Sequence, residues 1–152
     1  DISDLPIELR QSSFDHVIAN PPYLSARSGT PAKDSGKEAA FREETALNEW
    51  IDVAIKRLKP RGFLTLIHLS ERLPEILGYL AGRVGDIEVK PIASRQSQVA
   101  TRVVIRARKG ARGAFRLYPP FVVHEGDRHV EDRNDFTLRA REILRDGLPL
   151  TF

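Results

Sequence analysis

The alternation of hydrophobic and polar positions predicts strands and helices in turn along the first half of the chain. The apolar run Phe14–Ala19 predicts a short buried strand. Between residues 47 and 58 the hydrophobic side chains recur every three or four positions, which predicts an amphipathic helix that stops at the segment 59–62. The near-continuous apolar run 62–69 predicts a second strand, of the kind that a parallel sheet buries on both faces.

The second half of the chain continues the same alternation. Ser70 is predicted to cap a helix that carries Pro74 near its first turn. Thr137 is predicted to cap a last short helix. Between these helices we expect strands at 87–93 and 101–107, a turn at 109–113 and an extended segment at 115–123 that is interrupted by two prolines.

This order of elements predicts an α/β fold, with a mainly parallel sheet that is closed by an antiparallel hairpin. No glycine-rich loop follows any predicted strand, although such a loop belongs to the first half of a doubly wound domain. Residues 1–152 are therefore interpreted as the C-terminal part of a single domain, whose N-terminal, cofactor-binding half is absent from this chain. The chain has no methionine and opens at Asp1, so we expect further residues upstream.

Composition narrows the class of protein. With 41% hydrophobic and 30% charged residues, the chain is typical of a soluble globular domain. It has no cysteine, and its four histidines show no metal-ligand spacing, so no metal is expected. No apolar run approaches the roughly 18 residues of a membrane span, and no signal peptide is visible. We therefore expect a cytoplasmic protein without a membrane partner.

The positive charge is concentrated in one stretch of the chain. No acidic residue occurs from Val89 to His124, which raises the local positive potential and favours a polyanionic partner. The alternative is a solvated surface whose counter-charges lie elsewhere in the fold. The basic residues of this stretch are Lys90, Arg95, Arg102, Arg106, Arg108, Lys109, Arg112 and Arg116.

A stiff polar turn follows the first predicted strand, with the sequence Asn20-Pro21-Pro22-Tyr23. Each proline fixes its own φ and holds the preceding residue extended. The Asn20 side-chain oxygen and the Pro21 carbonyl could thus accept both N–H bonds of an exocyclic amino group, while Tyr23 stacks on the ring that carries it. The alternative is that the prolines only end the strand and that Tyr23 packs into the core.

The stretch "FDHVIANPPY" resembles the Asp/Asn-Pro-Pro-Tyr motif of amino-methylating class I methyltransferases, which use S-adenosylmethionine. The rest of the chain is similar to bacterial tRNA adenine-N6 methyltransferases that modify an adenine beside the anticodon of tRNA(Val). The similar blocks are "LNEWIDVAIKRLKPRGFLTLIHLSERLPEIL", "TRVVIRARKG" and "DFTLRAREILRD". The resemblance covers nearly the whole chain and implies the C-terminal half of a Rossmann-like class I methyltransferase fold.

The resemblance also implies roles for single residues. Asn20 and Pro21 would hold the target amino group, Pro22 would stiffen the turn, and Tyr23 would stack on the adenine. By spacing, Asp1 would be the acidic residue near the cofactor's adenine, with Asp4 as a fallback, and Asn20 would also border the cofactor. The family's glycine-rich loop and its ribose-binding acidic residue have no counterpart here.

The tRNA partner that the resemblance implies agrees with the basic stretch. By the period-2 rule Arg102, Arg106 and Arg108 share one face of a strand, and the turn after it extends the charge. The residues expected to hold tRNA phosphates are Arg102, Arg106, Arg108, Lys109 and Arg112.

Two other functions remain open at this stage. The glutamine N5 methyltransferases of release factors use the same motif on a side-chain amide, but the segments after the motif differ from theirs. A non-catalytic RNA-binding remnant of the fold is the other alternative, and the intact motif argues against it. In each case the outer edge of the Phe14–Ala19 strand lacks a neighbour, so we expect a missing N-terminal half or a second chain to cover that edge.

Overall fold

The computed structural model of the protein describes residues 5–21, 47–128 and 135–152. The elements of this part of the chain, in order, are α1 (Ile7–Gln11), β1 (Phe14–Ala19), α3 (Leu47–Arg57), β2 (Leu58–Leu69), the 3₁₀ turn η1 (Ser70–Arg72), α4 (Leu73–Leu80), β3 (Val84–Ala93), β4 (Arg102–Lys109), β5 (Arg116–Leu117), β6 (Phe121–Val122) and α5 (Leu138–Asp146).

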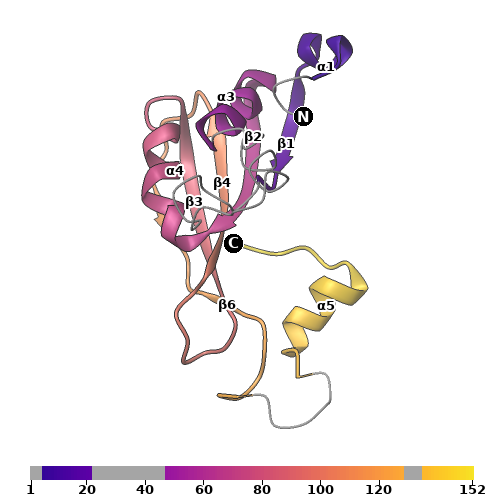
Figure 1. The fold of residues 1–152 in the computed structure, drawn as a ribbon, viewed down its shortest axis with the longest axis vertical. Coiled ribbons are helices and arrows are strands. Elements are labelled where there is room, and N and C mark those ends of the chain that lie inside the picture. Colours follow the sequence, from indigo (N-terminus) through magenta and orange to yellow (C-terminus); the bar gives the residue numbers. More distant parts are fainter. Residues whose placement is uncertain (1–4, 22–46, 129–134) are drawn as a thin grey trace, which may run out of the picture.

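The strands form one mixed sheet in the order β1-β2-β4-β3-β5, with β6 also paired to β3. The pairs β1–β2, β3–β5 and β3–β6 are parallel. Strand β4 lies between β2 and β3 and is antiparallel to both. This arrangement confirms the predicted α/β class with its closing hairpin. Strands β1, β2 and β3 therefore run in one direction, and we call the side where they end the carboxyl edge of the sheet (Figure 1).

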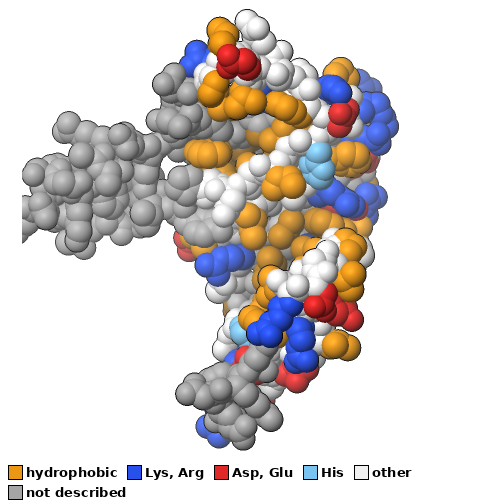
Figure 2. Space-filling model, turned by 90° about the vertical axis from the view of Figure 1, so that its right-hand side faces the viewer, with side chains coloured by type: hydrophobic (Ala, Val, Ile, Leu, Met, Phe, Trp, Pro, Cys, Tyr) orange, Lys and Arg blue, Asp and Glu red, His pale blue; other side chains and the backbone are white. Residues whose placement is uncertain are grey.

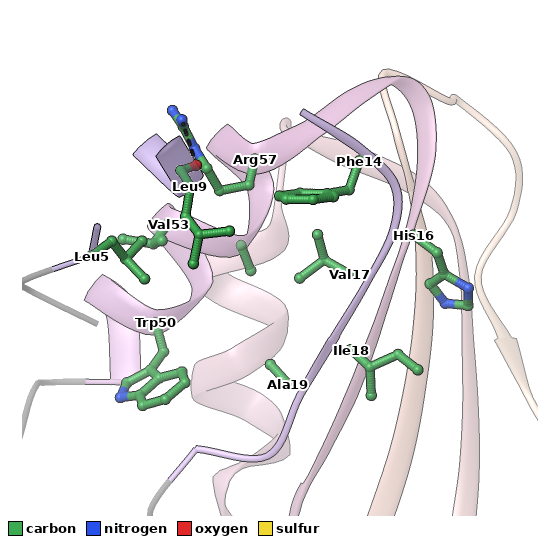
Figure 3. Close-up of a pocket in the computed structure, with 11 residues that line it drawn as sticks. Leu5, Leu9, Phe14, His16, Val17, Ile18, Ala19, Trp50, Val53 and Arg57 are labelled. Carbon is green, nitrogen blue, oxygen red and sulfur yellow. Dashed lines mark hydrogen bonds between the residues drawn. The ribbon is translucent and has the colours of Figure 1, made fainter. Parts of the chain in front are cut away.

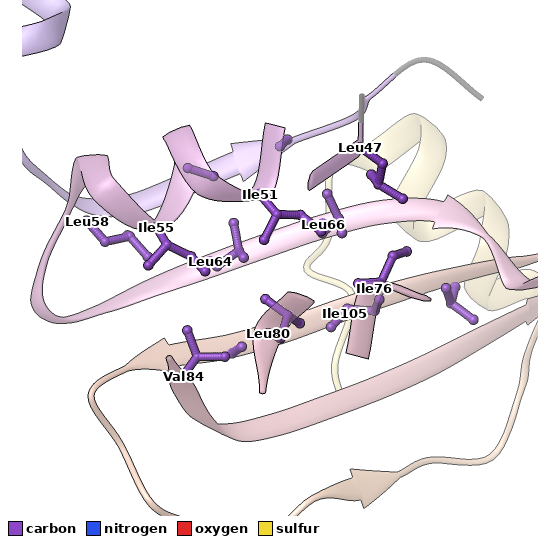
Figure 4. Packing of buried hydrophobic residues seen from close by; sticks show 14 of the residues in the cluster. Leu47, Ile51, Ile55, Leu58, Leu64, Leu66, Ile76, Leu80, Val84 and Ile105 are labelled. Atoms are coloured by element: carbon purple, nitrogen blue, oxygen red, sulfur yellow. The ribbon is translucent and has the colours of Figure 1, made fainter. Parts of the chain in front are cut away.

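The hydrophobic core lies between α3, α4 and one face of the sheet (Figure 4). Along β2 the residues alternate, with Leu64 and Leu66 buried and Phe63 exposed. The prediction that this strand is buried on both faces is therefore wrong for the described residues, because helices α3 and α4 cover the same face. We call the other side the open face; it carries Phe63, Thr65 and Ile67 of β2.

The helices follow the predicted hydrophobic periodicity, with small differences at their ends. Helix α3 ends at Arg57, and β2 begins directly after it at Leu58. The segment 59–62, which was expected to end the helix, is thus part of β2, with Arg61 at a positive φ of 65°. Helix α4 has a proline in its first turn, as expected for Pro74. The Thr137 hydroxyl accepts a hydrogen bond from the Ala140 N–H at 3.1 Å, which confirms the predicted cap of α5.

Strand β1 has the predicted bounds, but it is not a buried strand. Ile18 is 75% exposed and Phe14 is 37% exposed, whereas Ala19 is buried. The reason is topological: β1 is the last strand of the sheet, and within the described residues it pairs only with β2. Figure 2 faces this side of the molecule and shows hydrophobic side chains gathered over it.

The described residues contain neither a membrane-spanning helix nor a metal-binding cluster. None of the helices in this part of the chain is long and apolar enough to cross a membrane. Within the same residues, no three His, Asp or Glu side chains come together as a metal site would need.

Candidate functional site

The predicted acceptor turn begins at the carboxyl edge of the sheet. Ala19 is the last residue of β1 that pairs with β2, opposite Leu66, and Asn20 and Pro21 follow directly. Asn20 is exposed, whereas Pro21 is fully buried. The buried proline ring anchors the backbone, so the strand presents the Asn20 amide at its end. Pro22, Tyr23 and Asp1 lie outside the described residues.

The end of the neighbouring strand β2 is fixed to the start of β4. The Ser70 hydroxyl donates to the Ala100 carbonyl at 2.6 Å, and the Ser70 N–H donates to the Thr101 carbonyl at 3.0 Å. The expectation that the Ser70 side chain caps a helix is therefore wrong, because that hydroxyl is used to join two strands. These two hydrogen bonds fix the end of β2 to the segment that enters β4, on the side of β2 away from β1.

On α4, the Glu75 carboxylate is held ionised by two neighbouring side chains. Arg72 donates to Glu75 at 2.6 and 3.0 Å, and the Tyr79 hydroxyl donates to the same carboxylate at 2.9 Å. The hydrogen bonds from Arg72 lower the pKa of Glu75, and in turn the bond to Glu75 raises the pKa of Tyr79. Glu75 is thus an ion-pair partner that stays charged at neutral pH.

The charge of the central arginine on β4 is balanced across the sheet. Arg106 lies 2.5 Å from Glu88 of β3, which also accepts hydrogen bonds from Arg116 at 3.1 Å and from Tyr118 at 2.8 Å. Burial raises the pKa of Glu88, but the hydrogen bonds from Tyr118 and Arg106 outweigh it, so the net pKa lies below its ordinary value. Glu88 is the residue just before the acid-free stretch, and the period-2 register of two neighbouring strands was the signal that could have found it.

Two further basic residues of β4 make contacts at the amino end of the sheet. Lys109 donates to the carbonyls of Ile55 and Leu58, both at 2.7 Å, so its ammonium group satisfies the end of α3. Arg108 donates to the Arg61 carbonyl at 2.9 Å and stacks over the Phe63 ring at 5.0 Å.

The structure therefore divides the predicted phosphate-binding set. Arg102 begins β4 opposite Leu69, at the same carboxyl edge as Asn20. Lys109 and Arg112 lie at the other end of this strand, about 23 Å away for eight residues. Arg112 is exposed and has no ion pair with any described residue. Only Arg102 of this set is brought to the edge that presents Asn20.

An apolar groove of about 370 Å³ runs along the outer edge of β1 (Figure 3). Leu9 of α1, Trp50 and Val53 of α3, and Phe14 and Val17 of β1 line it. The lining offers few groups for chemistry. It provides apolar contacts beside a strand edge that is not paired in the described part of the chain, which is the setting for an additional strand.

The sheet order β1-β2-β4-β3, with an antiparallel strand inserted between two parallel ones, is an arrangement that occurs in the Rossmann-like fold of class I methyltransferases. Enzymes of this class use S-adenosylmethionine as methyl donor. The crystal structure of a predicted O-methyltransferase from Agrobacterium tumefaciens has this fold, with a TM-score of 0.66, 23% sequence identity, and coverage of 94% of this chain and 59% of that one. The chain thus spans about three fifths of the length of that protein.

Two structures of M1.HpyAVI, one of them a complex with SAM, are more distant, with TM-scores of 0.43 and 0.42 and 16% identity. These matches cover 86% and 82% of this chain and 56% and 64% of theirs. No protein-family model matches the chain, and no curated protein is significantly similar to it in sequence.

Proposed function

We propose that this chain is the acceptor-binding part of an S-adenosylmethionine-dependent methyltransferase that methylates the exocyclic N6 of an adenine, in tRNA. The observation that carries the proposal is the position of Asn20-Pro21. On a class I methyltransferase fold, this pair ends a parallel strand at the carboxyl edge, with the asparagine exposed and the proline buried. Ligands of doubly wound sheets bind outside this edge.

The chemistry assigned to the turn follows from its hydrogen-bond acceptors. The lone pair of an adenine amino group is delocalised into the ring, which makes the nitrogen a poor nucleophile. When the Asn20 side-chain oxygen and the Pro21 carbonyl accept its two N–H bonds, the nitrogen is drawn toward tetrahedral geometry and its lone pair becomes available. Pro22 would keep these acceptors in place, and Tyr23 would stack on the base, an interaction worth about 1–3 kcal/mol.

S-adenosylmethionine, when bound, supplies a methyl group that is already electrophilic, so no base is needed before the attack. Of the two residues assigned to the cofactor, the structure describes Asn20, whose exposed amide can both donate and accept. Asn20 thus fits a position between cofactor and acceptor, and Asp1 remains a proposal from the resemblance.

A nucleic-acid acceptor is supported by charge. The chain has a net charge of +3 and a pI near 9.4, which favours a polyanion over a neutral substrate. Arg102 carries part of this charge to the edge where Asn20 lies. A protein glutamine would need no such charge, so we favour the tRNA adenine.

The test is nucleoside mass spectrometry of tRNA from cells with and without the complete gene. We expect N6-methyladenosine to depend on the gene, and Asn20→Ala and Tyr23→Ala each to lower methyl transfer by about 10²–10³-fold. Asn20→Asp should retain most of the activity, because a carboxylate oxygen can replace the Asn20 amide oxygen as acceptor of one N–H bond, while the Pro21 carbonyl still accepts the other. Gln11→Ala removes an exposed amide at the end of α1, before β1 begins, and should have no effect.

Wild-type turnover in Asn20→Ala would contradict the proposed role of the turn. Methylated glutamine on release factors, with no change in tRNA nucleosides, would assign the same turn to a protein substrate instead.

A further inference from the structure

Helix α5 is attached to the carboxyl edge of the sheet. Strand β6 pairs with the end of β3, with Phe121 opposite Ile92 and Val122 opposite Ala93. The Thr137 N–H donates to the Val123 carbonyl at 2.9 Å, and its hydroxyl donates to the Val122 carbonyl at 3.0 Å. The helix therefore follows the edge where β3 ends, and it lies apart from the strands, after which the C-terminal segment returns to the sheet (Figure 1). The Phe152 ring then packs against Tyr118 and under the Arg106 guanidinium.

A partly buried ionic cluster precedes this helix. Arg95, which follows β3 and is only 7% exposed, lies 2.5 Å from the Asp135 carboxylate. The other oxygen of Asp135 is 2.7 Å from His124 Nδ1, and the His124 ring stacks on Phe136 at 5.0 Å. These contacts give the helix a defined origin at the carboxyl edge.

Helix α5 is capped at both ends and buries little of its surface. Thr137 caps its first turn, and Gly147 closes it in the left-handed conformation with a φ of 72°. The N–H groups of Gly147 and Leu148 both point to the Glu142 carbonyl. Ala140 is its only buried residue. A nine-residue helix is marginal without tertiary packing, so two good caps on an outlying helix indicate a use other than core formation.

Two arginines of α5 have no partner among the described residues. Arg139 is engaged, at 3.0 Å from Glu142 and 2.9 Å from the Pro149 carbonyl. Arg141 and Arg145 are exposed and make no hydrogen bond or ion pair within the described part of the chain. They lie four residues, or about 6 Å, apart on one side of the helix. Figure 2 shows basic side chains on the lower part of the molecule, where α5 lies.

We propose that α5 is an arm that binds the phosphate backbone of the nucleic-acid acceptor through Arg141 and Arg145. The guanidinium group binds phosphate with paired, charge-assisted hydrogen bonds. Leu138, which is 65% exposed on the same side of the helix, adds an apolar contact for an unpaired nucleotide. Phosphate contacts set register rather than sequence, so the arm positions the strand whose adenine enters at Asn20.

This inference rests on the proposed function and changes where the acceptor is held. Lys109 already binds the end of α3, and Arg112 lies at the opposite edge from Asn20. The sequence alone did not indicate these arginines as a binding site. The arginines of "TLRAREILRD" lie among acidic residues and outside the acid-free stretch from Val89 to His124.

The experiment compares single charge reversals at the two edges. The probe is a fluorescein-labelled RNA stem-loop with unpaired adenines, and its binding to the protein is followed by anisotropy over a series of salt concentrations. Arg141→Glu and Arg145→Glu should each weaken binding by about tenfold at low salt. Arg112→Glu makes the same charge change on an exposed arginine at the other edge and should change the affinity less than about threefold.

Alanine variants keep the test valid if a reversal disturbs the helix, because alanine is the best helix former. Arg141→Ala and Arg145→Ala should each lower the slope of log K against log salt concentration by about one. Circular dichroism of each variant reports whether the helix content is kept.

Equal losses in Arg112→Glu and the two arm variants, or no loss in the arm variants, would overturn the inference. A change in oligomeric mass in Leu138→Ala, with RNA affinity unchanged in Arg141→Ala and Arg145→Ala, would also overturn it and assign the helix to a protein partner. Normal RNA binding by the arm variants together with lost methylation in Asn20→Ala would reject the arm alone. Absence of both RNA binding and RNA methylation in the wild type would reject the proposed function as well.

Discussion

Glu88 is the residue that balances the positive charge of the central strands. Its side chain is only 8% exposed, yet it receives Arg106, Arg116 and the Tyr118 hydroxyl. A buried carboxylate is costly unless donors surround it, and here three groups from two other strands and their connection do so. The cluster thus joins β3, β4 and the segment that leads to β6.

Replacing Glu88 with alanine should lower the free energy of unfolding by about 1–3 kcal/mol, because three donors lose a charged acceptor. The two arginines are 39% and 51% exposed and can turn toward water, which keeps the loss moderate. Urea denaturation at pH 7 measures the loss. Glu71→Ala, at an exposed glutamate of η1, is the control and should have little effect. An equal loss of unfolding free energy in both variants would show that the contacts of Glu88 do not stabilise the fold.

The same residue predicts a pH dependence of stability. The pKa of Glu88 is lowered in the folded state from a value of 4.5, so its contribution is complete above that value and is lost as the pH falls through the folded pKa. Glu88→Gln cannot lose a proton and should reduce the difference in urea midpoint between pH 7 and pH 3. A pH dependence identical to that of the wild type would contradict this assignment.

At the scale of elements, the end of α3 depends on a lysine from another element. The last carbonyls of a helix have no partner within the helix, and Lys109 of β4 bonds to two carbonyls at this end, those of Ile55 and Leu58. The interaction couples the helix to a strand that is more than 40 residues distant in sequence. Because Lys109 is held at this end of β4, its ammonium group lies far from Asn20 at the carboxyl edge.

Lys109→Met keeps the aliphatic stem and removes the ammonium group, and it should lower the free energy of unfolding by about 1–2 kcal/mol. The measurement is urea unfolding followed by circular dichroism. Lys56→Met, at an exposed lysine in the last turn of the same helix, makes the same chemical change and should cost less. A larger loss in Lys56→Met than in Lys109→Met would contradict the role of Lys109.

At the scale of the whole molecule, the described residues leave one edge and one face of the sheet open. Strand β1 presents exposed Ile18 and Phe14 beside an apolar groove. Helices α3 and α4 cover the core face of the sheet, opposite the open face that carries Phe63, Thr65 and Ile67. Such an edge favours pairing with another strand. We propose that an N-terminal half or a second chain covers this edge.

Ile18→Lys should therefore reduce self-association of the 152-residue chain, because a lysine on an edge strand opposes pairing with a second strand. Light scattering over a range of protein concentrations measures it. Ile7→Lys changes another exposed isoleucine, 62% exposed on α1, and should leave association unchanged. A wild-type chain that stays monomeric at every concentration would contradict the prediction.

The sequence by itself determined the features that are local in the chain. The bounds of β1, the hydrophobic stripe of α3, the proline in the first turn of α4 and the Thr137 cap were all predicted from patterns within a few residues. The place of Asn20 at the end of a strand was predicted in the same way. Such features depend on backbone dihedrals and on neighbours at three or four positions, which a short stretch of sequence specifies.

The tertiary structure decided which side chains meet. The insertion of β4 between β2 and β3 sets Arg106 beside Glu88 and brings the Lys109 ammonium group to the end of α3. It also separates Arg102 from Arg112 by the length of a strand. It also leaves β1 at the edge of the sheet, so a strand with a buried pattern is exposed. Pairing between residues 18 or 54 positions apart depends on strand order and register, and local periodicity is the same for every order.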